Sequence, residues 1–429
     1  MIGMKHILLF LILLVSFQGM DAQVQRFPKP EFQTAYKVPT TVEPAPTSLL
    51  MEYVDVLVLV VVMSLTAWFI FKKRSRKGIL WLSVFSLAYF GFYREGCICS
   101  VGSVQNVSLA LFGEGYTLPL TVLLFFALPL LFSLAVGRVF CAAACPLGVV
   151  QDLVIVKPIK VAPWVQKSLG LFPYVYLALA VLYAATGTDF MICRYDPFVG
   201  IFRLGAGFNM IVLGICLLVI GMFVARPYCR FICPYGALLR VGSHLSKNHL
   251  SITPSNCINC KLCKNACPFD AIDFPVEEKE NKATRTDFRK FMLYLVLIPI
   301  LMAAGGWMMS ASHRLLASVH QDVALSEIIS KHPEVLLQKG NVDVDTFLAS
   351  GMSLETLNKK AEVVREKFRV GGWYAGAFIG LVLGLMLLNE VVFRKREIHT
   401  ANRSNCISCG RCMDFCPVEP TGGKKGKKK

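Results

Sequence analysis

The chain has 429 residues, of which 55% are hydrophobic and only 17% are charged, whereas about 25% are charged in a typical soluble domain. This composition excludes an ordinary soluble protein and predicts one that is embedded in a membrane. The formal net charge of +17 does not indicate a nucleic-acid partner, because the basic residues come without interleaved aromatic residues or a nucleic-acid-binding module. We expect them to face anionic lipid headgroups of the membrane.

The first 22 residues have the features of a secretory signal peptide. Lys5 precedes a short apolar core at 7–17, and the segment ends in a small residue, Ala22. We expect cleavage after Ala22. The alternative is an uncleaved anchor, which would need a longer apolar core. Residues 23–48 are rich in proline and are expected to form a disordered exported lead.

Seven later segments are apolar and come close to the roughly 20 residues that a transmembrane helix needs. They lie at 50–71, 79–93, 117–137, 171–190, 208–225, 291–310 and 373–393. The second segment is the shortest. The sequence therefore predicts an all-α integral membrane bundle of about seven transmembrane helices.

The basic residues predict the orientation of this bundle. With an exported N-terminus, the segments expected on the inner face are 72–78, 138–170, 226–290 and 394–429. These hold 30 Lys and Arg residues, and the segments expected on the outer face hold 14. Because inner loops of membrane proteins are enriched in Lys and Arg, we expect a multi-pass protein of the bacterial inner membrane with a cytoplasmic C-terminus.

Two cysteine pairs follow apolar segments within the bundle predicted for residues 49–240. Cys141 and Cys145 form one C-x3-C-P-x-G motif, and Cys229 and Cys233 form the other. Four thiols at a common depth could hold a third metal centre, or they could form dithiol and disulfide pairs. The sequence does not separate these two roles. Small buried residues are the structural alternative, which the repeated context disfavours.

A third, altered copy of this motif holds Cys97 and Cys99, with one residue between them and no proline. Cys193 follows the fourth apolar segment. On the predicted topology these three cysteines face the exported side, where they form either an outer redox site or a disulfide. Cys216 lies in the middle of an apolar segment and is expected to fill space in the bundle.

The most specific motif occurs twice. Residues 257–268 and 406–417 each read C-x2-C-x2-C-x3-C-P, the pattern that holds [4Fe–4S] clusters. Three cysteines of each run surround one cube, and the fourth usually reaches the neighbouring cube. We therefore expect two clusters, one on Cys257, Cys260, Cys263 and Cys416 and the other on Cys406, Cys409, Cys412 and Cys267. Zinc sites or disulfides are the alternative, but zinc motifs rarely repeat this run with its proline.

The two halves of this bacterial ferredoxin-like module, 241–290 and 394–429, are far apart in sequence. Between them lie a predicted transmembrane helix at 291–310, an exported helical insert at 311–371 and a second transmembrane helix at 372–393. The halves can share clusters only on the same side of the membrane, and the distribution of basic residues predicts the cytoplasmic side for both. We expect the insert to dock an exported partner.

The last apolar segment has a glycine at every fourth position, namely Gly372, Gly376, Gly380 and Gly384. This spacing leaves one helix face almost without side chains. We therefore expect a neighbouring helix to approach it closely.

Motifs for other cofactors are not evident. The sequence has no C-x-x-C-H haem attachment motif, no P-loop and no dinucleotide-binding glycine pattern, and no His lies inside a predicted span. We expect an electron-transfer subunit that carries iron–sulfur clusters, without haem, flavin or nucleotide, rather than a stand-alone catalyst.

Taken together, the motifs resemble those of the NosR/NapH/CcoG-like membrane polyferredoxins, over about residues 50–417. Two C-x3-C-P-x-G motifs at helix ends, followed by paired ferredoxin motifs, are typical of that group. The resemblance implies that Cys141, Cys145, Cys229 and Cys233 are redox positions.

The resemblance also implies a function. Such a protein passes electrons between the cytoplasmic face or the quinone pool and an exported reductase, or its flavin or cytochrome partner, as in nitrous-oxide or nitrate respiration. The alternative is a redox assembly factor that keeps copper or thiols reduced while an exported metalloenzyme matures.

Overall fold

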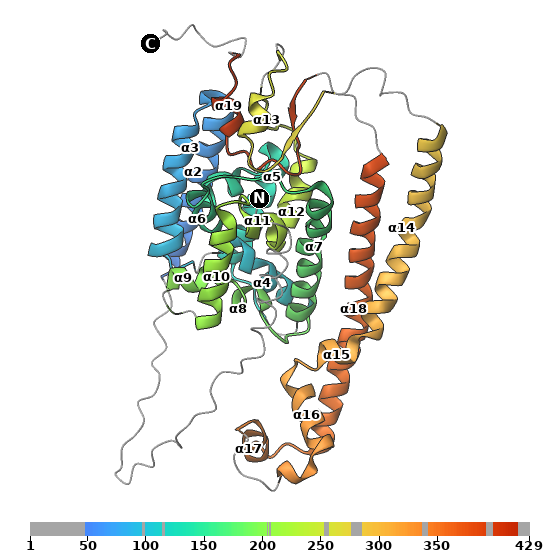
Figure 1. Cartoon of the computed structure of the whole chain (residues 1–429). Helices are drawn as coiled ribbons and strands as arrows, with labels where there is room; N and C mark the ends of the chain where they lie inside the picture. Colours follow the sequence, from blue (N-terminus) through green and yellow to red (C-terminus); the bar gives the residue numbers. More distant parts are fainter. Residues whose placement is uncertain are drawn as a thin grey trace. The chain divides into compact units, whose positions relative to one another are not determined.

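The computed structural model describes residues 48–96, 99–113, 116–203, 205, 207–252, 257–275, 285–336, 342–391 and 398–418. These residues are mostly helical, which agrees with the predicted all-α class (Figure 1). The predicted signal peptide lies outside the described residues, as does the predicted lead apart from Ser48.

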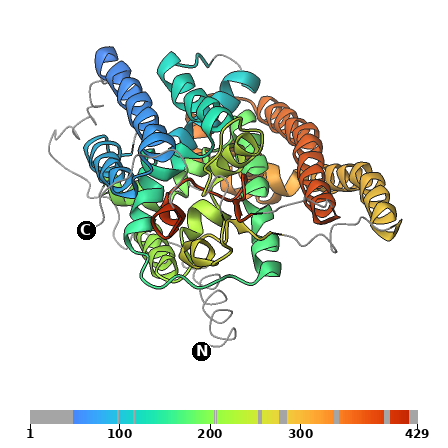
Figure 2. The same ribbon diagram turned by 90° about the horizontal axis from the view of Figure 1, so that it is seen from above.

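The first part of the chain forms a bundle of helices (Figures 1 and 2). Its elements are α2 (Leu49–Trp68), η2 (Phe69–Lys73), α3 (Arg76–Ser86), η3 (Leu87–Tyr93), α4 (Ser100–Phe112), α5 (Leu120–Val136), η4 (Phe140–Ala144), α6 (Pro146–Leu153), α7 (Pro163–Ala185), α8 (Met191–Arg194), α9 (Pro197–Arg203), α10 (Phe208–Gly221), α11 (Pro227–Phe231) and α12 (Pro234–His244). The three η segments are π-helical, a conformation that is rare and often found at functional sites.

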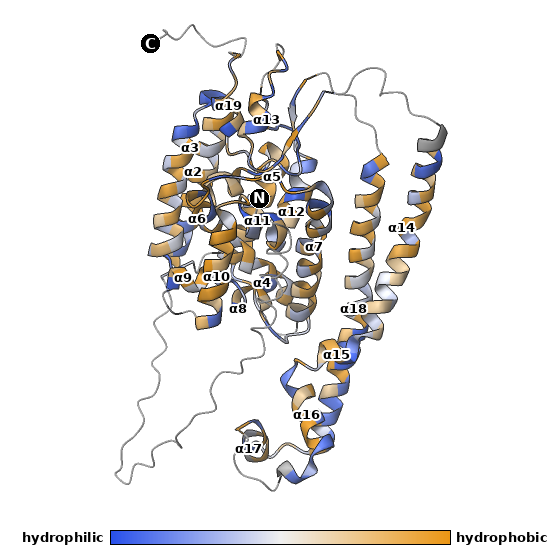
Figure 3. Ribbon diagram, viewed as in Figure 1, coloured by the Kyte–Doolittle hydropathy of each residue, from blue (hydrophilic) through white to orange (hydrophobic). Residues whose placement is uncertain are grey.

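Four of the described helices are long and apolar enough to cross a membrane. They are Leu49–Lys73, Pro163–Ala185, Phe288–Ala311 and Leu354–Val391. The bent pair α9 and α10 would add a fifth span, and α5 is apolar but has only 17 residues. Large apolar side chains such as Leu57 and Leu293 are exposed, each at 63%, as expected of surfaces that face lipid. The ribbon coloured by hydropathy shows that α2, α14 (Arg285–Ala311) and the second half of α18 (Leu354–Val391) are largely hydrophobic (Figure 3). The exact count of seven stays a prediction.

Helices α14 (Arg285–Ala311) and α18 (Leu354–Val391) lie side by side, and the predicted glycine face of α18 is their contact. A Cβ atom on Gly376 would overlap the carbonyl group of Gly305. One on Gly384 would lie 2.7 Å from Cγ1 of Ile298. The predicted close approach of a neighbouring helix is therefore confirmed, and α14 is that helix.

This contact predicts a large effect of a side chain at its centre. We expect Gly376→Leu to push α14 and α18 apart and to destabilise the purified protein by at least about 2 kcal/mol, because both backbones would have to move. Thermal unfolding in detergent measures this effect. Gly207→Ala is the matched control, since a Cβ atom there meets nothing within 4 Å. An unchanged melting temperature of Gly376→Leu would contradict the described packing.

The residues between these two helices form α15 (His313–Ala317), α16 (Gln321–Lys331), η6 (Pro333–Leu336) and α17 (Val342–Ala349). Helix α16 packs on the first half of α18, where Ser326 donates a hydrogen bond to Asn358 at 2.8 Å. The predicted boundary between insert and span, at residue 371, falls inside α18, which runs unbroken for 38 residues. Insert and span are therefore joined by one continuous helix.

The two ferredoxin-like halves come together in one lobe. It consists of α13 (Leu262–Ala266), β1 (Ile272–Asp273), β2 (Thr400–Ala401) and α19 (Arg411–Asp414). The strands pair antiparallel, with Ile272 opposite Ala401, and the backbone N–H of Asn402 donates to the carbonyl oxygen of Ala271 at 2.8 Å. Segments separated by two apolar spans thus share one small sheet.

One attachment of this lobe to the bundle is formed by the end of α12 and the residues after it. Ser243 donates a hydrogen bond to the carbonyl oxygen of Arg403 at 2.7 Å, and the Arg403 side chain donates to the carbonyl oxygen of Ser246 at 2.9 Å. The ferredoxin-like lobe therefore lies directly on the helices that carry the second C-x3-C-P motif.

Candidate iron–sulfur sites

One cavity in the lobe is lined by the cysteines of the first predicted cluster. Cys257, Cys260 and Cys263 come from the first half and Cys416 comes from the second, and together with Ile252 they line a cavity of about 330 Å³. The cavity also meets Ile258, His399 and Val418. Cys260 is exposed, whereas Cys263 is buried. This cavity thus has one sulfur that a partner in solution can approach.

A second cavity, of about 320 Å³, is lined by the other predicted set, Cys406, Cys409, Cys412 and Cys267. In both cavities the fourth cysteine comes from the opposite half of the lobe. Burial raises the pKa of the Cys406 thiol to about 12 and that of Cys409 to about 11. Without a metal these thiols stay protonated, and bound iron supplies the positive charge that stabilises thiolates. The donor set therefore suits [4Fe–4S] clusters.

The backbone has the same special conformation in both repeats. Asn259 and Lys261 have φ values of 54° and 61°, and Ser408 and Gly410, at the matching positions, have 57° and 75°. A left-handed conformation of a non-glycine residue is strained and persists where the surrounding structure requires it. The repeated pair of left-handed residues bends each C-x2-C-x2-C loop, and the three cysteines of each loop line one cavity.

No group of three His, Cys, Asp or Glu side chains within the described part of the chain converges closely enough to hold a single metal ion.

The two C-x3-C-P motifs share a local structure. Cys141 lies in the π-helical η4, and Cys145 is the N-cap of α6, whose first residue is Pro146. Cys229 lies in α11, and Cys233 caps α12 in the same way and accepts a hydrogen bond from the N–H of Gly236 at 3.3 Å. Proline suits the first position of a helix because it has no N–H and a fixed φ.

The glycine of the first motif makes room for a contact between motifs, and that of the second makes room for a contact within its own motif. A Cβ atom on Gly148 would lie 2.9 Å from Nη1 of Arg226, and one on Gly236 would lie 3.3 Å from the carbonyl oxygen of Cys229. The C-P-x-G spacing of the first motif therefore allows its turn to pack against residues of the other.

These turns bring the four thiols into one region. Cys145 lies within electrostatic range of Cys141, Cys229 and Cys233, and also of Cys99 in the altered third copy. The residues between Cys141 and Cys145 are alanines that are at most 2% exposed, so small side chains let neighbouring helices approach the sulfurs.

Sequence reasoning missed three residues that contact this group. Arg138 donates to Sγ of Cys141 at 3.6 Å, and Arg226 donates to the carbonyl oxygen of Cys141. Gln151 donates to Sγ of Cys229 at 3.3 Å. Both arginines precede the first cysteine of their motif by three positions, so the signal was a longer repeat, R-x2-C-x3-C-P-x-G.

Arg226 is held by a buried ion pair. It is 1% exposed, and its Nη2 lies 2.5 Å from Oδ2 of Asp152 while its Nε donates to Oδ1 at 2.8 Å. Burial by itself would lower the pKa of Arg226, but the Asp152 carboxylate raises it above the usual value. The guanidinium therefore stays charged beside the cysteines.

The altered third copy has a related arrangement, and its Cys99 lies close to the first C-x3-C-P motif. Gln105 follows Cys99 by six positions, as Gln151 follows Cys145, and its Oε1 accepts hydrogen bonds from the N–H groups of Ile192 and Cys193 at 3.1 and 3.4 Å. Cys99 and Cys193 are free thiols, and Cys193 is exposed. Cys97 lies outside the described residues.

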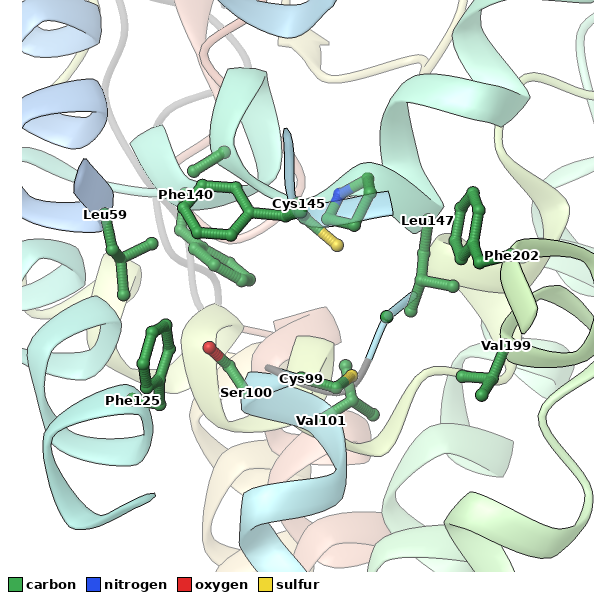
Figure 4. A pocket seen from close by; sticks show the side chains of 14 residues that line it. Leu59, Cys99, Ser100, Val101, Phe125, Phe140, Cys145, Leu147, Val199 and Phe202 are labelled. Atoms are coloured by element: carbon green, nitrogen blue, oxygen red, sulfur yellow. The ribbon is translucent and has the colours of Figure 1, made fainter. Parts of the chain in front are cut away.

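A cavity of about 430 Å³ connects this copy with the first C-x3-C-P motif (Figure 4). Cys99 and Cys145 both line it, and the remaining wall is largely apolar, with Phe125, Phe140 and Phe202 among its residues. The sulfurs of the two motifs thus border one shared space inside the bundle.

Comparisons with known proteins agree with these sites. One family model, described as a 4Fe-4S binding domain, matches residues 118–171 and 206–253, which carry the two C-x3-C-P motifs. A second model with the same description matches residues 250–273 and 399–420, which carry the ferredoxin motifs.

Several known proteins are similar in sequence. An uncharacterised protein of Methanocaldococcus jannaschii is 30% identical over 203 residues, which are 45% of this chain and 82% of that protein. The regulatory protein NosR of Pseudomonas aeruginosa is 30% identical over 47% of this chain and 30% of its own length. The methylamine utilization ferredoxin-type protein MauN of Paracoccus denitrificans is 27% identical over 35% of this chain and 55% of its own. No solved structure matches.

The fold and the cysteine-lined cavities define a membrane protein of the iron–sulfur, ferredoxin-bearing class. The chain belongs to the NosR-like membrane polyferredoxins, as the sequence motifs predicted. It spans 30% of the length of NosR itself.

Proposed function

We propose that this protein carries electrons through the membrane between a donor at the ferredoxin-like lobe and an acceptor at the opposite end of the bundle. The observation that carries the proposal is a series of cysteine-lined sites. It begins at the exposed Cys260, continues through the second cavity of the lobe and the C-x3-C-P cysteines, and ends at Cys99 and the exposed Cys193.

Within this series we assign two [4Fe–4S] clusters to the two cavities of the lobe, with the fourth cysteine of each motif exchanged between them. Each cluster, when bound, supplies a site that accepts and releases one electron. The protein places Cys260 at the surface for entry from a partner, and it places Cys409 within electrostatic range of Arg226, beside the next group of thiols. The chain thus orders the sites from surface to bundle.

We assign a third iron–sulfur centre to Cys141, Cys145, Cys229 and Cys233. Their mutual proximity and the match of a 4Fe-4S binding domain model to both surrounding segments support this assignment over dithiol pairs. Arg138 and Arg226 lie beside these thiols and would balance the negative charge of a thiolate-bound centre.

For the partners we propose a cytoplasmic donor or quinone and an exported reductase system of nitrogen-oxide respiration, in keeping with the similarity to NosR. The inner membrane, with the lobe and the C-terminus in the cytoplasm, is the proposed location, because the basic residues favour this orientation. The helices α15 to α17 would then contact the exported partner.

One observation favours a second candidate function. Cys193 is exposed in α8, at the end of the bundle away from the lobe (Figure 1), where a reducible exported thiol or copper site could receive electrons. This arrangement suits a factor that matures an exported metalloenzyme. Depleting the protein after the enzyme has matured separates the two functions: activity falls at once if the protein carries respiratory electrons, and it persists if the protein serves assembly.

Electron transfer can be tested directly in liposomes with the lobe facing outwards. Reduced ferredoxin is added outside and ferricyanide is enclosed inside. We expect the full-length protein to reduce the enclosed ferricyanide and Cys229→Ser to slow this reduction at least about tenfold, since each electron must pass the C-x3-C-P region. Cys216→Ser is the matched control. Liposomes with the protein that react no faster than protein-free ones would refute the proposal.

A further inference from the structure

A third cavity, of about 310 Å³, lies between the lobe and the bundle. It is distinct from the two cluster cavities of the lobe, and through Cys229 it borders the third iron–sulfur centre proposed above. Four arginines line it, together with Cys229 and three residues of the lobe, Phe269, Asn405 and Ile407. The arginines are Arg138, Arg226, Arg230 and Arg240. They come from the two C-x3-C-P segments and from α12. Arginines from separate parts of the fold therefore line the same cavity.

The charge of this cavity is poorly balanced. Arg138 and Arg226 are 3% and 1% exposed, and the described residues provide one carboxylate in an ion pair here, Asp152 on Arg226. Asp270 acts on Arg230 only at longer range. Burying several cations beside one paired carboxylate is costly unless further anions are present. The third iron–sulfur centre proposed above would offset part of the charge of Arg138 and Arg226, which donate to Cys141, whereas Arg230 and Arg240 make no hydrogen bond to its cysteines among the described residues.

The hydrogen-bond donors point to the same conclusion. Nε of Arg138, Nη2 of Arg230 and Nε of Arg240 are buried and have no partner among the described residues. Buried donors are nearly always satisfied in native proteins, by protein groups, water or a ligand. Guanidinium groups present forked N–H donors that match the oxygens of phosphate-like anions.

We propose that this cavity is a binding site for a tetrahedral oxyanion of the phosphate type. The anion would be held by the unpartnered donors of Arg138, Arg230 and Arg240 where the lobe meets the bundle, with Arg226 adding positive charge nearby. The phosphate can come from two sources, free inorganic phosphate or the headgroup of an anionic lipid, and both present the same oxygens to the arginines. The anion would join the lobe to the C-x3-C-P segments, because Arg138 also donates to the carbonyl oxygen of Ser404 in the lobe at 3.4 Å.

The test uses the purified full-length protein loaded with iron. Binding of radiolabelled inorganic phosphate is measured by equilibrium dialysis, and anionic lipid that stays bound is identified by native mass spectrometry. We expect one phosphate-bearing ligand per chain. Arg240→Gln should weaken its binding at least about tenfold, since hydrogen bonds to a charged group are lost. Arg314→Gln, which removes an exposed arginine of the insert, should leave binding unchanged.

The results distinguish inorganic phosphate from a lipid headgroup, and they test the anion site separately from the proposed iron–sulfur sites. If unlabelled phosphate displaces the radiolabelled phosphate, the ligand is inorganic phosphate. If the wild-type protein retains a phospholipid that the Arg240→Gln variant loses, the ligand is a lipid headgroup. No bound ligand of either kind, or binding unchanged in Arg240→Gln, would overturn the inference. Phosphate binding only to protein depleted of iron would also overturn it, because the clusters themselves would then be the counter-charge. Iron content measured on each sample shows separately whether the proposed iron–sulfur sites are intact.

Discussion

Replacing Cys267 by alanine is expected to remove the iron–sulfur cluster of the second ferredoxin motif, not that of the motif in which Cys267 itself lies. In the structure Cys267 lines the cavity of Cys406, Cys409 and Cys412. Its loss leaves one iron of that cube without a thiolate, and iron content should fall by about four atoms per chain. Iron analysis combined with alkylation and mass spectrometry measures both effects.

The alkylation pattern decides between the two possible ligand sets. We expect Cys406, Cys409 and Cys412 to become reactive in Cys267→Ala, while Cys257 and Cys260 stay protected. Cys416→Ala should give the reverse pattern, because Cys416 lines the first cavity. Cys216→Ala, which alters a cysteine of α10, should keep all clusters. Labelling of Cys257 and Cys260 in Cys267→Ala would show that each motif holds its own cube.

The ferredoxin-like lobe was predictable from sequence because each of its cysteine motifs is a short, continuous segment of the chain. Each C-x2-C-x2-C run needs only a short loop with left-handed residues at fixed positions, and the structure has them at Lys261 and Gly410. Predicting that the two halves meet needed one further argument, namely that both follow spans ending on the same face. The pairing of Ile272 with Ala401 agrees with that argument.

The arrangement around the C-x3-C-P motifs was only partly predictable. The cysteines stand out by spacing, but Gln151 and Asp152 act through contacts with the other motif, which depend on how α6 and α11 pack. The same limit applies to α18. Its glycine face indicated a close neighbour, whereas the continuity of the helix across residue 371 depends on packing of α16 against its polar half.

Changing all four C-x3-C-P cysteines to serine is expected to reduce the iron content from about twelve to about eight atoms per chain, because a third cube is lost while the two in the lobe remain. The four thiols lie close together beneath the lobe, and none of them lines the lobe cavities. Iron analysis and EPR spectra of the reduced protein measure this change, with Cys216→Ser as control.

The EPR spectra distinguish loss of the third cluster alone from general unfolding of the serine variant. The two signals of the lobe clusters should persist in the variant, since the lobe's own sheet and loops hold those cysteines. A wild-type protein that contains about eight iron atoms would show that the four thiols are free of metal. Reversible alkylation of these thiols after reduction would then establish that they form dithiol pairs, and that electrons cross this part of the bundle through disulfide chemistry.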